Sequence, residues 1–143
     1  MKKIDYYSKS VSETFDIARL FSEKATPGMV ILLEGSLGAG KSVFVRGFLS
    51  GLGINEAIPS PTFTLVNEYN GKFKIYHFDF YRLNDPYELY EIGFEDYVYS
   101  NGISLIEWPS KGGDLIPLNA YKINIEIKSL SDRNISIAIP DKI

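Results

Sequence analysis

The chain has 143 residues, of which 45% are hydrophobic and 23% are charged. This length and composition predict a single compact domain over residues 1–143, which builds its core without a metal or disulfides. With 15 basic and 18 acidic residues, the net charge is -3, which argues against a broad nucleic-acid surface. The absence of cysteine excludes disulfides, thiolate zinc sites and a cysteine nucleophile. The longest apolar run, Met29–Leu33, is far shorter than the roughly 20 residues of a membrane span, so we expect a cytoplasmic protein.

The first third of the sequence predicts a helix, a strand and a second helix. Ser10 and Glu13 have capping-box spacing, and apolar residues follow at helical intervals. The run Met29–Leu33 is short and continuously apolar, which is typical of a strand buried on both faces of a parallel sheet. After a glycine-rich turn, apolar residues recur with helical period over residues 41–52, although two glycines weaken this second helix.

The middle of the sequence predicts a hairpin and a short helix. Phe63–Tyr69 and Phe73–Phe80 are rich in strand-forming residues and are separated by Asn70-Gly71, a signal for an antiparallel hairpin with a type I′ turn. Asp85-Pro86, followed by Glu88, combines an N-cap, a proline at the first helical position and capping-box spacing. We therefore expect a short helix to start there.

The last third predicts a second buried strand and a closing hairpin. Ile103–Glu107 is another short apolar strand, and Pro109 ends it. Isoleucines alternate with polar residues over residues 123–127 and again over 135–139, as in a half-buried hairpin. Together the elements predict an α/β fold whose mixed sheet has a parallel core and antiparallel hairpins.

The turn between the first strand and the second helix carries the clearest chemical signal. Residues 35–42 read Gly-Ser-Leu-Gly-Ala-Gly-Lys-Ser, which fits the Walker A pattern G-x-x-x-x-G-K-[ST] in its required strand and helix context. In such a P-loop, backbone N–H groups and the helix N-terminus surround phosphate oxygens. Lys41 would reach the β and γ phosphates, and Ser42 would offer its hydroxyl to Mg²⁺. We therefore expect a three-layer P-loop NTPase-like domain.

A P-loop also needs a carboxylate that holds Mg²⁺ or polarises water at the end of a neighbouring strand. Glu107 ends an apolar strand and is the better Walker-B-like match, and Asp79 near the end of its own strand is the alternative. His77 shares a face with Asp79 by strand alternation. A lone histidine is more often structural than catalytic, so the structural role is favoured for His77 and the catalytic one stays open.

Two further stretches allow more than one interpretation. The segment Ser60–Thr64, after the P-loop helix, supplies a hydroxyl to a metal or phosphate, as switch segments do, or else Pro59 and Pro61 simply shape a turn there. Between Asp79 and Tyr99, acids outnumber bases six to one among many tyrosines. This stretch is either a solvated surface or a docking surface for a basic partner.

Taken together, the motifs resemble one family, the small bacterial P-loop ATPase TsaE of tRNA threonylcarbamoyladenosine biosynthesis. The resemblance is carried, in order, by residues 35–42 with Arg46-Gly47, by Ser60-Pro61-Thr62-Phe63-Thr64-Leu65-Val66, by Tyr76-His77-Phe78-Asp79-Phe80-Tyr81-Arg82-Leu83, and by Leu105-Ile106-Glu107-Trp108-Pro109. The match is strong over residues 35–117, moderate over the first helix and weak in the closing hairpin.

The resemblance implies ATP and Mg²⁺ as cofactors and a role for individual residues. It implies that Ser42 and Glu107 hold Mg²⁺, and that Lys41, Asp79, Glu107 and Thr62 form the catalytic or switch shell. Residues implied to contact the nucleotide are Val11, Gly35, Gly38, Ala39, Gly40, Lys41, Ser42, Trp108 and Arg133.

The family resemblance also implies partners and a weak intrinsic activity. The implied function is a nucleotide switch that binds the TsaD and TsaB proteins and uses ATP hydrolysis to sustain their turnover, with tRNA involved only indirectly. Ser36 stands where the family usually has Asp, and Val43 where it often has a hydroxyl residue. These departures concern nucleotide affinity and rate rather than the binding mode.

Three alternatives use the same phosphate cradle. A P-loop kinase for a small metabolite usually brings several arginines over the transferred phosphate, but this chain has four in all and no arginine-rich lid. A GTPase would carry the Asn-Lys-x-Asp guanine motif, which does not occur. A nucleotide-gated binding module without turnover differs from an ATPase only by a rate.

Overall fold

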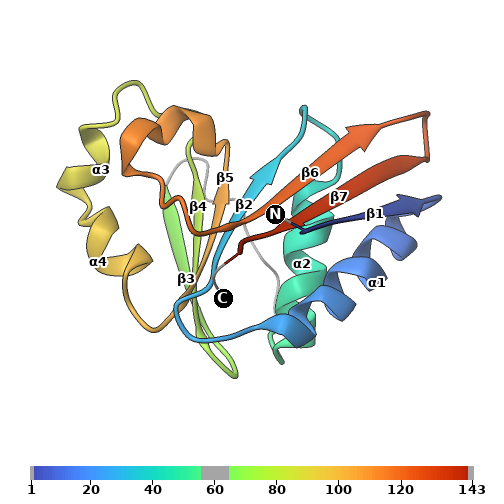
Figure 1. Cartoon of the computed structure of the whole chain (residues 1–143), viewed down its shortest axis with the longest axis horizontal. Coiled ribbons are helices and arrows are strands. Elements are labelled where there is room, and N and C mark those ends of the chain that lie inside the picture. The colour runs from blue at the N-terminus through green and yellow to red at the C-terminus, as the bar shows by residue number, and fades with distance from the viewer. Residues whose placement is uncertain (1, 56–64, 142–143) are drawn as a thin grey trace.

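A seven-stranded mixed sheet forms the middle layer of the fold, with helices on both faces (Figure 1). The computed structural model describes residues 2–55 and 65–141. The strand order is β1-β7-β6-β2-β5-β4-β3. The strands are β1 (Lys2–Ser8), β2 (Val30–Glu34), β3 (Val66–Asn70), β4 (Lys74–Asp79), β5 (Ile103–Glu107), β6 (Tyr121–Ile127) and β7 (Arg133–Ile139). The helices are α1 (Val11–Phe21), α2 (Lys41–Gly51), α3 (Glu88–Glu91) and α4 (Phe94–Val98), with 3₁₀ turns η1 (Ser22–Lys24) and η2 (Pro109–Leu115). The three-layer α/β fold predicted from the sequence is confirmed.

The parallel core consists of β2, β5 and β4, and β6 also runs parallel to β2. Both predicted buried strands, β2 and β5, lie next to each other in its centre. Every residue of β5 is buried, as are all residues of β2 except the last, Glu34. A continuous apolar run forms a strand there because helices cover both faces of the sheet.

The antiparallel parts flank this core on both sides. The predicted hairpins β3–β4 and β6–β7 are both present. The predicted type I′ turn is wrong, because neither Asn70 nor Gly71 has a positive φ angle. Asn70 instead pairs with Lys74 across a three-residue loop. A Cβ atom on Gly71 would lie 2.7 Å from the carbonyl oxygen of Leu52, so glycine is needed here for close approach rather than for φ.

Strand β1 was not predicted from the sequence. It pairs antiparallel with β7 along its whole length, from Lys2 opposite Ile139 to Ser8 opposite Arg133. Only every second residue of β1, such as Ile4 and Tyr6, faces the core, and it forms an edge of the sheet. An edge strand with few apolar residues gives a weak sequence signal, and its pairing partner lies at the other end of the chain.

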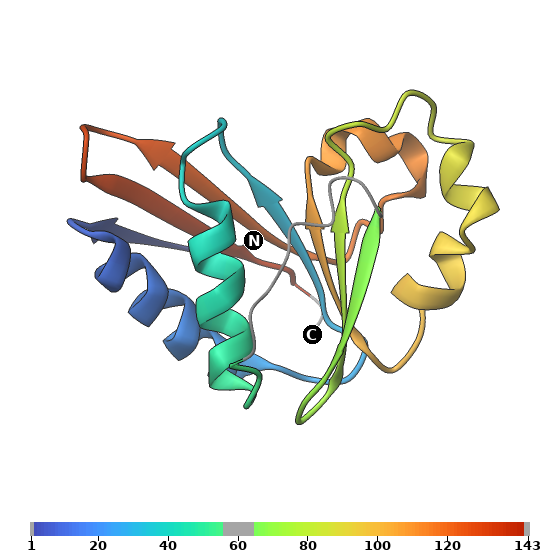
Figure 2. The same cartoon turned by 180° about the vertical axis from the view of Figure 1, so that it is seen from behind.

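Helices α1 and α2 cover one face of the sheet and pack closely on each other (Figure 2). A Cβ atom on Gly47 would lie 2.3 Å from the carbonyl oxygen of Phe15, and one on Gly51 would lie 1.8 Å from the hydroxyl of Ser22. These two glycines weaken α2 as an isolated helix, yet they allow α1 to approach it.

The other face of the sheet packs against α3, α4 and η2 through an aromatic cluster. Phe78, Phe80 and Phe94 are fully buried there with their rings in edge contact. The predicted helix after Asp85-Pro86 begins at Glu88, because the Asp85 carboxylate accepts a hydrogen bond from the Tyr87 amide in a turn that precedes it. Helix α4 was not predicted.

The first predicted cap is confirmed. The Ser10 hydroxyl accepts a hydrogen bond from the Glu13 amide, and the Glu13 carboxylate accepts one from the Lys9 amide.

Within residues 2–55 and 65–141, no helix has the length and apolarity needed to cross a bilayer.

Candidate functional site

The glycine-rich segment between β2 and α2 forms a closed loop around the Lys41 side chain. The Lys41 ammonium donates a hydrogen bond of 2.7 Å to the Gly35 carbonyl, at the other end of the loop. Gly38 and Gly40 have φ angles of 81° and 111°, which side chains rarely adopt. Gly40 also caps helix α2, so the N–H groups of the first helical turn face the loop. This is the strand–loop–helix arrangement that the Walker A pattern predicts.

Strand β6 supports this loop from the side. A Cβ atom on Gly35 would lie 2.8 Å from the carbonyl oxygen of Ile125 in β6 and 3.2 Å from Cβ of Ala39. Any larger residue at position 35 would therefore push the loop away from the sheet. The parallel pairing of β6 with β2 thus requires the first glycine of the motif.

The Lys41 ammonium lies in a dry and negatively charged environment. Lys41 is only 6% exposed, and its ammonium lies 3.7 Å from the centroid of the Trp108 ring. Burial lowers the pKa of Lys41, and the negative charges of Glu107, Asp79 and Glu34 partly oppose this by raising the pKa. A desolvated ammonium beside a pocket is a favourable partner for a phosphate oxygen.

Asp79 and Glu107 end the two neighbouring parallel strands β4 and β5 and lie opposite each other in register. Both are buried, with exposed fractions of 5% and 6%. One Asp79 oxygen accepts a hydrogen bond of 2.9 Å from the Tyr81 amide, and one Glu107 oxygen lies 2.6 Å from the His77 ring. The structure therefore brings both predicted carboxylates to one edge of the sheet.

A pocket of about 450 Å³ joins these groups, and we call it the Lys41 pocket. It is lined by Leu37, Gly38, Gly40, Lys41, Ser42, Val43, Asp79, Tyr81, Glu107 and Trp108. Ser42 is exposed in the first turn of α2. The pocket therefore combines a hydroxyl, two carboxylates and a lysine with a helix N-terminus. Thr62 falls outside the described residues.

The donor set of the Lys41 pocket fits Mg²⁺ better than a metal held by the protein alone. In the described part of the chain, no three His, Asp or Glu side chains converge as a metal site. Mg²⁺ is usually held by one or two protein oxygens, with phosphate and water completing its octahedron. Ser42 together with Glu107 or Asp79 fits that arrangement.

Trp108 connects the Lys41 pocket to the surface through a tilted ring contact that sequence reasoning did not find. Its backbone is left-handed, with φ 57° and ψ 49°, which is rare for a bulky residue. The Tyr81 ring lies 5.1 Å from the Trp108 ring, and the Lys111 ammonium lies 5.2 Å from the Tyr81 ring. Lys111 also donates a hydrogen bond to the Tyr81 carbonyl. No local pattern signals this contact, because it joins segments 30 residues apart.

A second pocket of about 370 Å³, which we call the Val11 pocket, adjoins the P-loop on its other side. Both predicted peripheral residues, Val11 and Arg133, line it. Val11 is the first residue of α1 and is 66% exposed. Sequence reasoning missed the other residues that line it outside the P-loop and α2, which are Lys9, Ser10, Thr14, Leu130 and Ser131.

Arg133 is hydrogen-bonded to the P-loop itself. Its guanidinium donates bonds of 2.9 Å to the Ala39 carbonyl and 3.3 Å to the Gly38 carbonyl. A further bond of 2.9 Å, to the Ser129 carbonyl, closes the turn between β6 and β7. Arg133 therefore ties the C-terminal hairpin to the P-loop.

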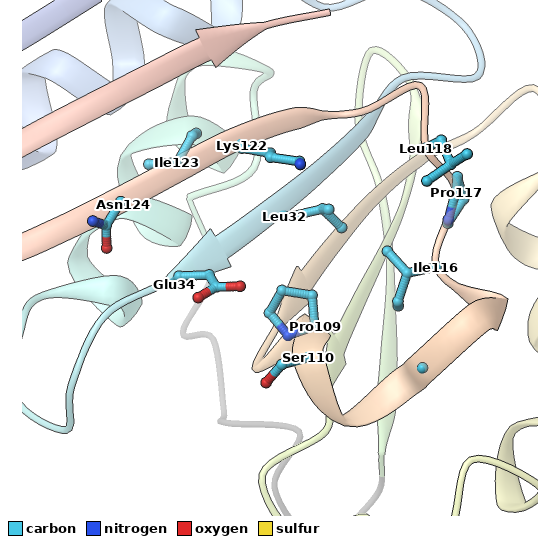
Figure 3. Close-up of a pocket in the computed structure, with 11 residues that line it drawn as sticks. Leu32, Glu34, Pro109, Ser110, Ile116, Pro117, Leu118, Lys122, Ile123 and Asn124 are labelled. Atoms are coloured by element: carbon cyan, nitrogen blue, oxygen red, sulfur yellow. The ribbon is translucent and has the colours of Figure 1, made fainter.

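A third cavity lies on the opposite face of the sheet from α1 and α2, and we call it the η2 groove (Figure 3). It measures about 460 Å³ and lies between η2 and the strands β2 and β6. Leu32, Pro109 and Ile116 give it an apolar lining, with Glu34, Lys122 and Asn124 on the strands beside them. None of the predicted site residues that the structure describes lines this groove.

Comparison with known proteins identifies relatives over nearly the whole chain. Residues 8–135 match the family model of the threonylcarbamoyl adenosine biosynthesis protein TsaE. The chain is 39% identical to the tRNA threonylcarbamoyladenosine biosynthesis protein TsaE of Bacillus subtilis, over 95% of this chain and 85% of the relative. It is 37% identical to the TsaE protein of Treponema pallidum, over 92% of this chain and 96% of the relative. The crystal structure of Bacillus subtilis YdiB superimposes with a TM-score of 0.85 at 34% identity, covering 99% of this chain and 88% of that one.

Proposed function

The chain belongs to the TsaE family of tRNA threonylcarbamoyladenosine biosynthesis proteins, and we propose that it serves this pathway as a weak Mg²⁺-dependent ATPase. In this proposal the bound nucleotide switches its interaction with TsaD and TsaB, and hydrolysis sustains their turnover. The observation that carries the proposal is the Lys41 pocket, where a P-loop lysine and two buried carboxylates line one cavity.

The phosphates of ATP would bind at the N-terminus of α2. The N–H groups of residues 38 and 40–42 and the Lys41 ammonium are the donors closest to it, whereas the Ala39 N–H already donates to the Ser36 carbonyl. The helix dipole adds positive potential. In the structure the Lys41 ammonium is engaged by the Gly35 carbonyl and the Trp108 ring. A phosphate oxygen offers it a charged partner in place of the ring, and charge-assisted hydrogen bonds are about twice as strong as neutral ones.

Mg²⁺ would be held by the Ser42 hydroxyl and the Glu107 carboxylate, both of which line the Lys41 pocket. When bound, Mg²⁺ neutralises charge that develops on the β and γ phosphates. Asp79, whose carboxylate is oriented by the Tyr81 amide, would then orient the attacking water. We assign Thr62 to the same shell as a switch residue.

The nucleoside would occupy the Val11 pocket. This pocket shares Gly38, Gly40 and Val43 with the Lys41 pocket, so one ligand can extend across both. Val11 and Leu130 present exposed apolar side chains at this pocket, and apolar contacts suit the faces of a purine. Arg133 would support the P-loop from the same side through its bonds to Ala39 and Gly38.

A switch is favoured over a small-molecule kinase by the positions of the four arginines. Arg19 lies on α1 and contacts Asp16, and Arg133 lies on the Val11 side of the P-loop. Arg46 and Arg82 are exposed, and neither lines the Lys41 pocket. A kinase usually surrounds the transferred phosphate with several arginines.

The surface around α3 and α4 suits a protein partner with basic residues. Tyr87, Tyr90 and Tyr99 are 73%, 57% and 68% exposed, beside acidic side chains of both helices. Exposed tyrosines are enriched at protein interfaces, and complementary charge favours association. We propose this surface as a contact for the TsaD–TsaB pair.

The test is steady-state ATP hydrolysis by the purified chain, alone and with TsaD and TsaB from the same organism. We expect slow Mg²⁺-dependent hydrolysis that the pair stimulates and that Lys41→Ala abolishes. Lys24→Ala, which changes an exposed lysine outside the pockets, is the matched control and should behave as wild type. If the pair neither binds nor stimulates the wild-type chain, the switch is wrong, and metabolites should then be screened as phosphate acceptors.

A further inference from the structure

His77 and Glu107 form a buried pair, of which the proposed function uses only Glu107. The His77 Nε2 atom lies 2.6 Å from the Glu107 Oε2 atom, and their side chains are only 4% and 8% exposed. Both residues project from neighbouring parallel strands toward the α2 side of the sheet, two residues apart in register. Glu107 lines the Lys41 pocket, whereas His77 does not. His77 therefore contacts the Glu107 carboxylate on the side away from the Lys41 pocket.

The hydrogen bond has a defined direction. An ionised carboxylate can only accept, so the histidine ring donates from Nε2. The other ring nitrogen, Nδ1, is buried without a hydrogen-bond partner among the described residues. A second N–H there would be a buried donor without an acceptor, which costs more than an unfilled acceptor. The geometry thus requires a proton on Nε2 and offers no acceptor for one on Nδ1.

We propose that His77 is a positioning residue that fixes the Glu107 carboxylate for metal binding. Oε2 is held by the ring, which leaves Oε1 as the oxygen that Glu107 can present to the Lys41 pocket. Glu107 would therefore bind Mg²⁺ through one oxygen in a fixed rotamer. Residues that orient a metal ligand in this way typically change metal affinity about 10–100-fold when they are removed. This proposal rests on the Mg²⁺-dependent nucleotide binding proposed above.

The second carboxylate of the pocket, Asp79, is oriented by a backbone amide rather than by a side chain. Asp79 receives its hydrogen bond from the backbone amide of Tyr81, two residues further along the chain. A backbone donor is present at position 81 for every residue except proline. The orientation of Glu107, by contrast, depends on one side chain, so substitutions at position 77 isolate it.

The hydrogen bond itself can be tested without nucleotide, because His77 is the only histidine of the chain. Long-range ¹H–¹⁵N spectra of the intact protein report which ring nitrogen carries the proton. We expect two well-separated nitrogen signals in the pattern of the Nε2–H tautomer. A spectrum of the Nδ1–H tautomer, or averaged signals from a mixture, would overturn the proposal.

The metal-orienting role is tested by variants that differ in donor reach. His77→Gln places an N–H donor close to the position of Nε2, His77→Asn has a donor too short to reach it, and His77→Leu has none. For each we would measure fluorescent-ADP binding in EDTA, and then the Mg²⁺ concentration that gives half-maximal nucleotide binding and ATP hydrolysis.

We expect ADP affinity in EDTA to be the same in all four proteins. The Mg²⁺ midpoint should rise about 10-fold or more in His77→Asn and His77→Leu and stay within about 3-fold of wild type in His77→Gln. Equal loss in Gln and Asn variants would mean that His77 acts through packing only, and unchanged midpoints in all variants would mean that it has no role. Both results would overturn the proposal.

Two controls keep the outcome interpretable. Thermal melts identify any variant that does not fold, and the Gln and Asn variants, which are both polar, allow a comparison if the Leu variant is lost. If the wild-type chain shows no Mg²⁺-dependent nucleotide binding at all, the proposed function fails, while the tautomer measured by NMR still decides whether the His77–Glu107 bond exists.

Discussion

The parallel part of the sheet, β2, β5 and β4, carries buried polar side chains near the ends of β4 and β5. The antiparallel part, β6, β7 and β1, contacts the P-loop through the exposed turn between β6 and β7. In the parallel part, His77, Asp79 and Glu107 are each at most 6% exposed. In the antiparallel part, the turn that follows β6 contains the fully exposed Leu130 and is held to the P-loop by Arg133.

This difference indicates a division of labour. Groups that must keep a fixed charge and geometry lie at the ends of buried parallel strands, where each carboxylate has a dedicated hydrogen-bond donor. Groups that only add contact area lie on a turn, where substitutions leave the core intact. We therefore expect changes in the parallel part to abolish phosphate chemistry and changes in the antiparallel part to alter affinity.

The largest effect should come from Lys41→Ala. Removing one partner of a buried charged hydrogen bond costs about 2–5 kcal/mol, so nucleotide affinity should fall at least about 30-fold. The free energy of unfolding should not fall, because burial lowers the pKa of Lys41 and thus disfavours its charged form in the folded state. Fluorescent-ADP titration and a urea denaturation curve measure the two quantities. Unchanged affinity would place the phosphates elsewhere.

The carboxylates provide the next test. Glu107→Gln removes the carboxylate that would hold Mg²⁺ and should slow ATP hydrolysis about 100-fold, because charge stabilisation by a bound metal is worth several kcal/mol. It should leave ADP binding in EDTA unchanged. Asp79→Asn is the matched change on the neighbouring strand. If Asp79→Asn abolishes hydrolysis and Glu107→Gln does not, the roles proposed for Asp79 and Glu107 must be exchanged. The Mg²⁺ concentration that gives half-maximal hydrolysis in each variant shows which carboxylate holds the metal.

The parallel part was also the more predictable one. The strands β2 and β5, the P-loop and the carboxylates Asp79 and Glu107 could all be located from local patterns. Their signals are strong because a buried parallel strand is continuously apolar and a phosphate loop needs glycines at fixed spacing. The register that sets Asp79 opposite Glu107 follows from the pairing of β4 with β5.

What could not be predicted depends on pairing between distant segments. The bond from His77 to Glu107 spans 30 residues, and the bonds from Arg133 to the P-loop span more than 90. Strand β1 likewise depends on its pairing with β7, and the Trp108 ring depends on its contact with Tyr81. The type I′ turn was wrong because Gly71 serves the packing of the hairpin against Leu52, which a two-residue motif does not encode.

Helix α1 follows β1 of the antiparallel part, and helix α2 follows β2 of the parallel part. Their contact can be disrupted at Gly47. A methyl group there would lie 2.3 Å from the Phe15 carbonyl, a backbone atom that cannot rotate away. Overpacking of this kind costs about 1–3 kcal/mol, so Gly47→Ala should lower the free energy of unfolding despite better helix propensity. Urea denaturation measures the loss. Ser12→Ala, at an exposed position of α1, is the control and should change stability little.

Arg133 tests the antiparallel part directly. Arg133→Ala removes two hydrogen bonds from a charged donor to the P-loop, and a net loss of about 1.5 kcal/mol corresponds to a roughly 10-fold weaker nucleotide affinity. Because the carboxylates and Lys41 remain, KM for ATP should rise while kcat stays the same. Arg133→Lys keeps the charge but not the planar guanidinium group, so its nucleotide affinity should lie between those of the wild type and Arg133→Ala. A fall in kcat would contradict the division of labour.

The smallest effect concerns the only tryptophan of the chain, Trp108. Its ring contacts the Lys41 ammonium, a cation–π interaction worth about 1 kcal/mol. Phosphate binding should draw the ammonium from the ring, so Trp108 emission should change when ADP is added to the wild-type chain. In Lys41→Ala the emission without nucleotide should already differ, and ADP should not change it further. An ADP-dependent change that persists in Lys41→Ala at saturating nucleotide would show that Trp108 responds to the nucleotide directly. In that case the ring contact between Trp108 and Tyr81, and not the lysine, would connect the pocket with the surface.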